Sequence, residues 1–227
     1  LAQCARDVLA VGGMACLSDR FTASAHADAT QIESRSWVKT RGIYGGFPQA
    51  ILDRGHTPAD YGINAVWIGS GGLNAEEIDR YHGLGVKVFA EFNTMHVAGL
   101  MKDNPNAAPI GVDGKVSPPP QGWQGICPTH AGYRQFRMDA FRKVLREFEI
   151  DGIWLDYHHS HASWERAEPD MPDTCFCRRC IDQFARETKA DLPDETAPQL
   201  TRRLLDEHKD AWVKWRCDVF TDWIRQF

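Results

Sequence analysis

Long hydrophobic runs and clusters of basic residues are both missing from this sequence. No apolar run approaches the roughly 18 residues that a membrane-spanning helix needs, so the sequence predicts no membrane span. The 227 residues include 26 Lys and Arg against 31 Asp and Glu, a net charge of -5, and the basic residues form no run. This balance argues against nucleic acid and anionic membranes as partners. A small or neutral partner fits the charge better.

The composition is that of an ordinary globular protein. Hydrophobic residues make up 43% of the chain and charged residues 25%, and the 8 Trp and 11 Phe are sufficient for a core. The length allows one large domain or two small ones.

The first 27 residues permit two interpretations. A short apolar segment runs from Val8 to Leu17, and the tripeptide Ala25-His26-Ala27 fits the small-x-small rule for leader-peptidase cleavage. In the first interpretation, residues 1–27 are an export leader that resembles the twin-arginine type, and the mature protein is secreted or periplasmic. In the second, they form an amphipathic first helix of a cytoplasmic protein.

Strand-like and helix-like patterns alternate along the rest of the chain. Four short apolar runs are typical of buried strands, and apolar residues at helical spacing lie between them. Parallel strands that alternate with helices define an α/β fold. The expected strands are Arg41–Phe47, Ile63–Ile68, Val86–Phe92 and Ile150–Asp156, and helices are expected at 74–85, 131–149 and 200–223.

The number of strands predicts part of a TIM barrel. A complete (β/α)8 barrel has eight strands and typically about 250 residues, whereas this sequence shows four strands and stops within a helical pattern. We therefore expect residues 28–227 to form the N-terminal half of such a barrel, a truncated barrel with about four βα units. In these barrels the reactive groups lie on the loops that follow the strands.

The fourth expected strand ends in a carboxylate. Its sequence is Ile-Asp-Gly-Ile-Trp-Leu-Asp, and a buried strand can end in a charge where that end lies at a mouth. Alternation along the strand places Trp154, Asp156 and His158 on one face. The sequence therefore predicts Asp156 at the rim of a cavity. The alternative is that Asp156 only caps the following loop.

Polar side chains also lie on one face of the third expected strand. Alternation puts Glu91 and Asn93 on the same face, near Asp156, and His96 follows closely. Glu91 could then face the mouth. It could equally be buried in a structural pair with Lys87 or Arg41.

Three histidines follow Asp156 within five residues. His158, His159 and His161 beside a carboxylate could hold zinc or iron. Their spacing matches no established ligand motif, so recognition of sugar hydroxyls or packing under the loop is favoured.

Three cysteines lie within six residues, in the pattern Cys-x-Cys-x-x-Cys. The thiols of Cys175, Cys177 and Cys180 could hold one tetrahedral zinc ion, with a fourth ligand from Cys127, His130 or another histidine. The alternative is a disulfide to Cys127 or Cys217. In either case the cysteines are expected to tie down the loop after the fourth strand.

These motifs together resemble the glycosidase-like TIM barrels grouped as hypothetical glycosyl hydrolases, the family numbered six, and more distantly the α-amylase and α-L-fucosidase barrels. The specific part of the resemblance is Asp-Gly-Ile-Trp-Leu-Asp-Tyr at 151–157 with Cys-Phe-Cys-Arg-Arg-Cys at 175–180 and Phe184. Weaker matches are Gly-Val-Lys-Val-Phe-Ala-Glu-Phe-Asn at 85–93, Asp-Gly-Lys at 113–115, Ile-Cys-Pro-Thr-His at 126–130 and Trp215-Arg216.

The resemblance implies a carbohydrate-active enzyme in which Asp156 is the nucleophile or stabilises an oxocarbenium-like transition state. Glycoside hydrolysis generally needs two carboxyl groups. In comparable barrels the second comes from a later strand, which would lie beyond Phe227, and Glu91 could replace it only if its side chain points into the mouth. The expected aromatic platforms for a sugar are Trp154, Trp123, Tyr44 and Phe47, and the expected partners for its hydroxyls are Asn93, His96, His158, His159 and Arg41.

Two other functions are compatible with the sequence. One is a barrel that binds carbohydrate without hydrolysing it. The other is a metal-dependent hydrolase or deacetylase that uses Asp156 with the histidines at 158–161. No feature of the sequence indicates an oligomeric state.

Overall fold

A computed structural model describes residues 37–96, 103–117, 125–158, 167–168 and 173–227. The chain divides into two units, Leu1–Lys39 and Thr40–Phe227, and every helix and strand named below belongs to the second. The expected leader at 1–27, Trp123, His159 and His161 lie outside the described residues.

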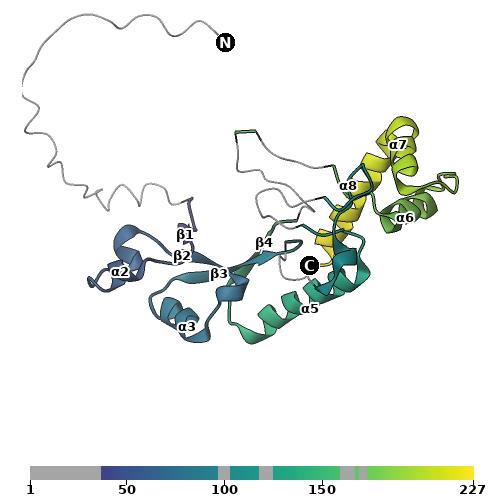
Figure 1. Ribbon diagram of the computed structural model, residues 1–227. Helices are drawn as coiled ribbons and strands as arrows, with labels where there is room; N and C mark the ends of the chain where they lie inside the picture. The colour runs from purple at the N-terminus through teal and green to yellow at the C-terminus, as the bar shows by residue number, and fades with distance from the viewer. Residues whose placement is uncertain (1–36, 97–102, 118–124, 159–166, 169–172) are drawn as a thin grey trace, which may run out of the picture. The chain divides into compact units, whose positions relative to one another are not determined.

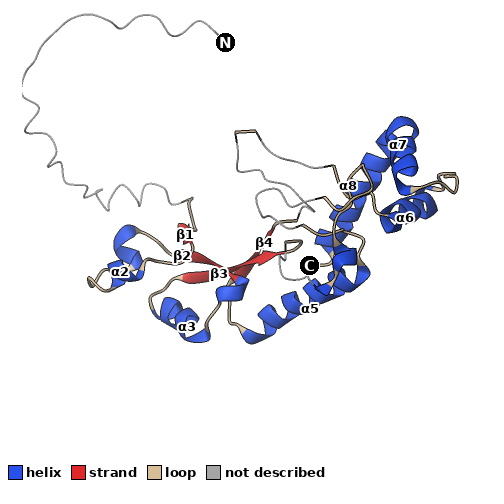
Figure 2. Cartoon of the chain, in the orientation of Figure 1, coloured by secondary structure: helices blue, strands red, loops and turns tan. Residues whose placement is uncertain are grey.

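Four parallel strands form a single sheet (Figures 1 and 2). They are β1 (Gly42–Tyr44), β2 (Ala65–Gly69), β3 (Lys87–Asn93) and β4 (Gly152–Asp156), in the order β1-β2-β3-β4. β1 and β4 lie within expected runs, and β2 and β3 each extend one residue past the end of theirs, so the α/β fold with parallel strands is confirmed. The further expectation, that this sheet is part of a barrel, stays a proposal.

Six α-helices are described around and after the strands. They are α2 (Gln49–Leu52), α3 (Ala75–Gly83), α5 (Ala131–Glu147), α6 (Arg178–Thr188), α7 (Ala197–Glu207) and α8 (Lys209–Arg225). Short 3-10 turns lie at Pro58–Tyr61, Ser70–Gly72 and Pro105–Ala107. None of the described helices is long and apolar enough to cross a membrane.

The expected single helix at 200–223 is two helices, α7 and α8, separated at His208. The backbone of His208, with φ -127° and ψ 16°, leaves the helical region, and its carbonyl accepts the Trp212 N–H at 2.8 Å. No glycine or proline marks this break. Because the chain bends there, the side chains of Leu204 on α7 and Trp212 on α8 are buried in the same hydrophobic cluster.

One face of the sheet is packed against helices α3 and α5. Asn74 caps α3 by accepting the Glu77 N–H at 3.1 Å, and Ile78 and Tyr81 of that helix bury against the strands. Further along, the apolar stripe of α5 packs on β3. The side chains of this core are Val66, Val88, Ala90 and Phe92 from the strands with Ile78, Tyr81, Met138, Phe141 and Val144 from the helices.

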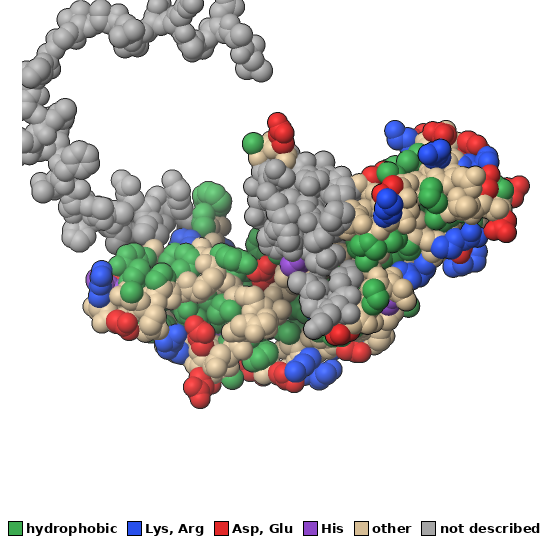
Figure 3. All heavy atoms as spheres, in the orientation of Figure 1, with side chains coloured by type: hydrophobic (Ala, Val, Ile, Leu, Met, Phe, Trp, Pro, Cys, Tyr) green, Lys and Arg blue, Asp and Glu red, His purple; other side chains and the backbone are tan. Residues whose placement is uncertain are grey.

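The opposite face of the sheet is aromatic, and we call it the aromatic face. Strand register places Tyr44, Trp67 and Phe89 side by side, and Glu91 beside Trp154 one step further along. The Trp67 and Phe89 rings stack with centroids 5.0 Å apart, and Trp154 meets Trp67 edge-on at 6.4 Å. Figure 3 shows hydrophobic side chains at the surface over β1 and β2.

Glycines at both edges of the sheet make room for these rings. A Cβ atom on Gly42 would lie 2.0 Å from the Trp67 ring, and one on Gly152 would lie 2.8 Å from the Phe89 ring. Only glycine therefore lets Trp67 and Phe89 lie flat across their neighbouring strands. The sequence alone did not indicate this role for Gly42 and Gly152.

A second hydrophobic cluster surrounds the cysteines. Phe176 stacks on Trp212 with centroids 5.4 Å apart, and Phe184 meets Trp212 edge-on at 5.2 Å. The cluster joins the segment at 174–177 to three helices and consists of Cys127, Cys175, Phe176, Cys180, Ile181, Phe184, Leu200, Leu204, Trp212, Trp215 and Val219.

Candidate active site and cysteine centre

Asp156 ends β4 at the carboxyl edge of the sheet, directly beside Asn93. One carboxylate oxygen accepts the Tyr157 N–H at 2.7 Å, and the Asp156 carbonyl accepts the Thr94 N–H at 2.9 Å. Asp156 therefore lies at the strand end that the sequence predicted, and it also caps the turn that follows. The alternative expectation, that Asp156 caps the following loop, is thus observed, and its position at the rim of a cavity stays a prediction.

Tyr157, the residue after Asp156, has an unusual backbone conformation. Its φ of 48° lies in the left-handed region, which is costly for a bulky side chain. The Tyr157 carbonyl accepts the Met95 N–H at 3.0 Å, and its ring lies 5.5 Å from that of His96. Strained residues of this kind cluster at functional sites.

Glu91 is almost fully buried, with 6% of its surface exposed, and it accepts a hydrogen bond from the Tyr44 hydroxyl. The bond crosses from β1 to β3 over the intervening strand. A polar partner for a buried Glu91 was expected, but Lys87 and Arg41 were named for that place and Tyr44 occupies it. Arg41 instead lies at the amino ends of the strands, where its Nε donates to the Gly62 carbonyl at 2.7 Å.

The Tyr44 hydroxyl is held in its protonated form by an acidic environment. The hydrogen bond to Glu91, partial burial and the negative charge of Glu91 raise the pKa of Tyr44 to about 12. The proton of this hydrogen bond therefore stays on Tyr44 at neutral pH. Glu91 and Asp156 lie on neighbouring strands, two residues apart in register and on the same face, so we call Tyr44, Glu91 and Asp156 the acidic cluster.

Arg137 of α5 holds the end of β3, and the sequence analysis missed it. Its guanidinium donates to the Asn93 carbonyl and lies over the Phe92 ring at 4.3 Å. Burial, followed by the charge of Arg137, lowers the pKa of His96, so this half-buried imidazole is neutral near pH 7. The available signal was a charged residue on the apolar stripe of the helix, four residues from both Tyr133 and Phe141.

The other residues predicted to contact the substrate differ in how exposed they are. Trp154 is 54% exposed on the aromatic face, and His158 is exposed just after the strained turn. Phe47 is only 7% exposed and packs in the core beneath the sheet with Val66 and Ile78, so little of it could contact a sugar. Trp123 and His159 lie outside the described residues.

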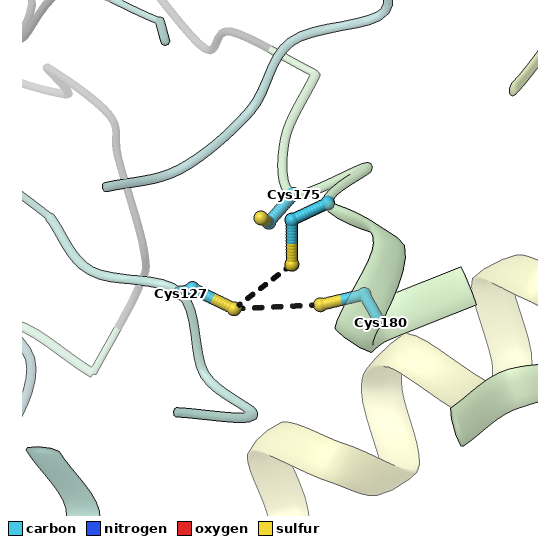
Figure 4. A group of neighbouring side chains, drawn as sticks. Cys127, Cys175 and Cys180 are labelled. Carbon is cyan, nitrogen blue, oxygen red and sulfur yellow. Dashed lines mark hydrogen bonds between the residues drawn. The ribbon is translucent and has the colours of Figure 1, made fainter. Parts of the chain in front are cut away.

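Four cysteines meet in one place, which we call the cysteine centre: Cys127, Cys175, Cys177 and Cys180. Their sulfur atoms all lie within 4.8 Å of one another. The Cys127 Sγ is 3.6 Å from that of Cys177 and 3.5 Å from that of Cys180. Figure 4 shows Cys127, Cys175 and Cys180 pointing toward a common point from separate segments. Three of the four side chains are buried.

The geometry of the cysteine centre fits a tetrahedral metal ion. Zinc bonded to sulfur at about 2.3 Å separates its ligands by about 3.8 Å, close to the observed spacing, whereas a disulfide needs about 2.05 Å. The described cysteines form no disulfide, and Cys217 is exposed on α8. His130 caps α5 through Nδ1, which accepts the Tyr133 N–H at 3.1 Å. Cys127, rather than His130, therefore completes the set.

Hydrogen bonds among the four sulfur atoms split their ionisation. They lower the pKa of Cys127 and of Cys177 and raise the pKa of Cys175 and of Cys180.

The described chain has an α/β fold with a parallel four-stranded sheet, similar to glycoside hydrolase domains. The α-L-fucosidase isoenzyme 2 from Paenibacillus thiaminolyticus matches with a TM-score of 0.51 and 16% identity, over 82% of this chain and 29% of the fucosidase. No protein-family model matches the sequence, and no curated protein sequence matches it.

Two further solved structures align less well. The galactosidase domain of an α-galactosidase-sucrose kinase has a TM-score of 0.41 and 19% identity over 52% of this chain and 21% of its own. The β-galactosidase from Bacillus circulans sp. alkalophilus has a TM-score of 0.44 and 15% identity over 65% of this chain and 24% of its own. This chain therefore spans less than a third of each of the three proteins. At such identities the likeness concerns the fold alone.

Proposed function

We propose that this chain is part of a glycoside hydrolase that acts on an oligosaccharide or polysaccharide, with Asp156 as a catalytic carboxylate. The observation that carries the proposal is the acidic cluster of Asp156, Glu91 and Tyr44 beside an exposed Trp154. The sequence resemblance to hypothetical glycosyl hydrolases of the family numbered six agrees with this assignment. So does the glycoside hydrolase-like fold.

The sheet itself supports a barrel as the complete fold. Parallel sheets are normally covered on both faces, and in the described residues only the face opposite the aromatic one is packed against helices α3 and α5. In a barrel the aromatic face would be the interior, and the carboxyl edge that holds Asp156 would be the mouth.

Hydrolysis of a glycosidic bond needs one carboxyl group to protonate the leaving oxygen and another to attack or to activate water. Asp156 has one oxygen fixed by the Tyr157 N–H, which leaves the other to face the anomeric carbon. The resemblance places the general acid on a later strand of a longer protein. Glu91 is the second carboxylate within the described chain.

Glu91 lies close to Asp156, although its side chain is almost fully buried. It is one strand across and two residues back from Asp156, so the two Cα atoms are about 8 Å apart for ordinary strand spacing. Because Tyr44 keeps its proton and donates to Glu91, the pair adds negative charge beside a developing oxocarbenium ion.

The remaining predicted contacts suit a neutral sugar. Trp154 and Tyr44 offer exposed rings for its apolar face, and Asn93, His96 and His158 offer polar groups at the carboxyl edge. Trp123 and His159 stay part of the proposal, as does export through a leader at 1–27. Sugar binding without hydrolysis would favour the carbohydrate-binding alternative instead.

The cysteine centre is proposed to hold a structural zinc ion. Four thiol ligands close a zinc site and leave no position for water, so this centre is not expected to take part in hydrolysis. The ion would join the turn before α5, the segment at 174–177 and the first turn of α6. The described residues bring no other group of ligand-type side chains together. His159 and His161, on which the metal-dependent alternative also depends, lie outside the described residues.

The substitution Asp156→Asn tests the catalytic assignment. Assayed with a panel of aryl glycosides, the variant is expected to lose about 1,000-fold or more in kcat/KM, because the transition state loses its nearest negative charge. Asp206→Asn, which makes the same change at an exposed position on α7, is the matched control. Unchanged hydrolysis by Asp156→Asn would refute the assignment.

A further inference from the structure

A threonine hydroxyl lies inside the cysteine centre. Thr129 is 7% exposed, and its Oγ1 is 3.2 Å from the sulfur of Cys127 and 3.2 Å from the sulfur of Cys180. The two sulfurs come from different segments, the turn before α5 and the first turn of α6. Thr129 therefore bridges the two halves of the centre.

Other donors surround the same sulfur atoms. The backbone N–H of Ile110 donates to the Cys175 sulfur at 3.3 Å. Arg179 lies between Cys177 and Cys180 in the sequence. It carries a positive charge, and its guanidinium also donates to the Asn106 carbonyl at 3.2 Å. The cysteine centre is thus enclosed by groups that stabilise negative charge.

Charge balance explains why such donors are needed. Four thiolates around one divalent ion carry two excess negative charges, and burial of uncompensated charge is costly. Hydrogen bonds to the sulfurs withdraw part of this charge. Groups that contact the metal ligands in this way usually contribute to metal affinity.

We propose that Thr129 is a functional part of the metal centre, in which its hydroxyl donates to the thiolates of Cys127 and Cys180. The inference rests on the proposed metal site and goes beyond the four ligands. Without metal, one thiol can donate to Oγ1 while the hydroxyl donates to the other sulfur. When the metal displaces the thiol protons, the Thr129 proton is the one left among these three atoms, and it is shared between two thiolates.

The test uses Co²⁺ as a spectroscopic probe in the whole chain. Thr129→Val has nearly the same shape but no hydroxyl, so its thiolates retain more electron density. We expect its sulfur-to-cobalt charge-transfer band to move to lower energy. Zinc should also pass to an excess of a coloured chelator about 10- to 100-fold faster than from the unmodified protein.

Two sets of variants keep the test specific. Thr129→Ser retains the hydroxyl and is expected to restore the band energy and the slow zinc release. Thr201→Val is the control, because Thr201 is also buried but its hydroxyl donates to the Ala197 carbonyl within α7. If Thr129→Val does not fold, Thr129→Ala and Thr129→Ser differ only in the hydroxyl and provide the same comparison.

The outcomes separate this inference from the metal centre itself. A Thr129→Val protein with the unmodified band energy and release rate would overturn the role of Thr129 and leave the metal site standing. A chain that takes up no Co²⁺ with all four cysteines reduced would overturn the metal centre, and the role of Thr129 with it.

Discussion

At the scale of single residues, the contact between Tyr44 and Glu91 changes the role expected for an exposed aromatic. The sequence suggested Tyr44 as a platform for a sugar ring, and 72% of its surface is indeed exposed. Its hydroxyl nevertheless donates a hydrogen bond to the buried carboxylate of Glu91. Tyr44 can therefore position Glu91 and contact a sugar with its ring at the same time.

The raised pKa of Tyr44 gives a direct test of this contact. Tyrosinate absorbance of the native protein minus that of Tyr44→Phe should show a step near pH 12, instead of near the ordinary value of 10. A step near pH 10 would contradict the hydrogen bond. Tyr61→Phe, another exposed tyrosine, is the control for the loss of a ring hydroxyl.

The same shift fixes the pH dependence of stability. Because the pKa of Tyr44 is higher in the folded than in the unfolded state, its contribution is complete below about pH 10. It is lost as the pH rises through about 12. The free energy of unfolding of the native protein should therefore fall toward that of Tyr44→Phe over this interval, as measured by urea denaturation.

At the scale of secondary-structure elements, the two flat rings of the aromatic face depend on edge glycines. Gly42→Ala would place a methyl group 2.0 Å from the Trp67 ring, so the ring or the strand must move. We expect a loss of about 1–3 kcal/mol in the free energy of unfolding, the usual cost of overpacking. Thermal denaturation with near-ultraviolet circular dichroism measures both the stability and the Trp67 environment.

Gly69→Ala is the matched control on the same face of the sheet. No atom lies within 4 Å of the position that its Cβ would take. It should leave the Trp67 signal unchanged. If both alanine variants behaved alike, close packing of Trp67 on β1 would not be the cause.

The end of α6 offers a stabilising change. Lys189 caps this helix with a φ of 59°, in the left-handed region where glycine is normal. Lys189→Gly is expected to raise the free energy of unfolding by about 0.5–1 kcal/mol, since the strain at this residue is relieved. Lys214→Gly, in the middle of α8, should lower it by about 1 kcal/mol instead. Urea denaturation of the three proteins decides the question.

Sequence patterns predicted the strands and most helices because both depend on local periodicity and glycine signals. The break at His208 was missed, since what bends the chain there is the shared burial of Leu204 and Trp212. Side-chain contacts between strands could not be predicted from the sequence either. The bond from Tyr44 to Glu91 depends on the register of three strands, which no single segment specifies.

In the candidate site, too, residues in local sequence patterns were predicted and residues that depend on distant contacts were not. Asp156 stands out in the sequence because it ends an apolar run. The three clustered cysteines stand out because they form a short motif of their own. Cys127 was one of several options for a fourth ligand, and only the fold brings it to the others. Thr129 and Arg137 were not identified, because their importance comes from neighbours distant in the chain.

At the scale of the whole molecule, the cysteine centre connects the aromatic cluster of α6 to α8 with the helix that supports the sheet. Cys127 lies three residues before His130, the cap of α5, and Tyr133 of that helix donates to the Thr94 carbonyl at 2.9 Å. Thr94 in turn donates through its N–H to the Asp156 carbonyl. A bound ion would thus restrain the helix that underlies the candidate active site.

A bound ion should therefore contribute to the stability of the entire chain. Ligands that bind only the folded state stabilise it in proportion to the logarithm of their concentration, by about 2.7 kcal/mol at a hundredfold excess over Kd. We expect one zinc per chain by elemental analysis and a lower melting temperature after chelation. Cys177→Ser should lose both the zinc and the effect of the chelator, whereas Cys217→Ser, at the exposed cysteine on α8, should keep both. Zinc retained by Cys177→Ser would show that the ion is not held by this set of four sulfurs. A melting temperature unaffected by chelation would show that these segments are held together without a metal.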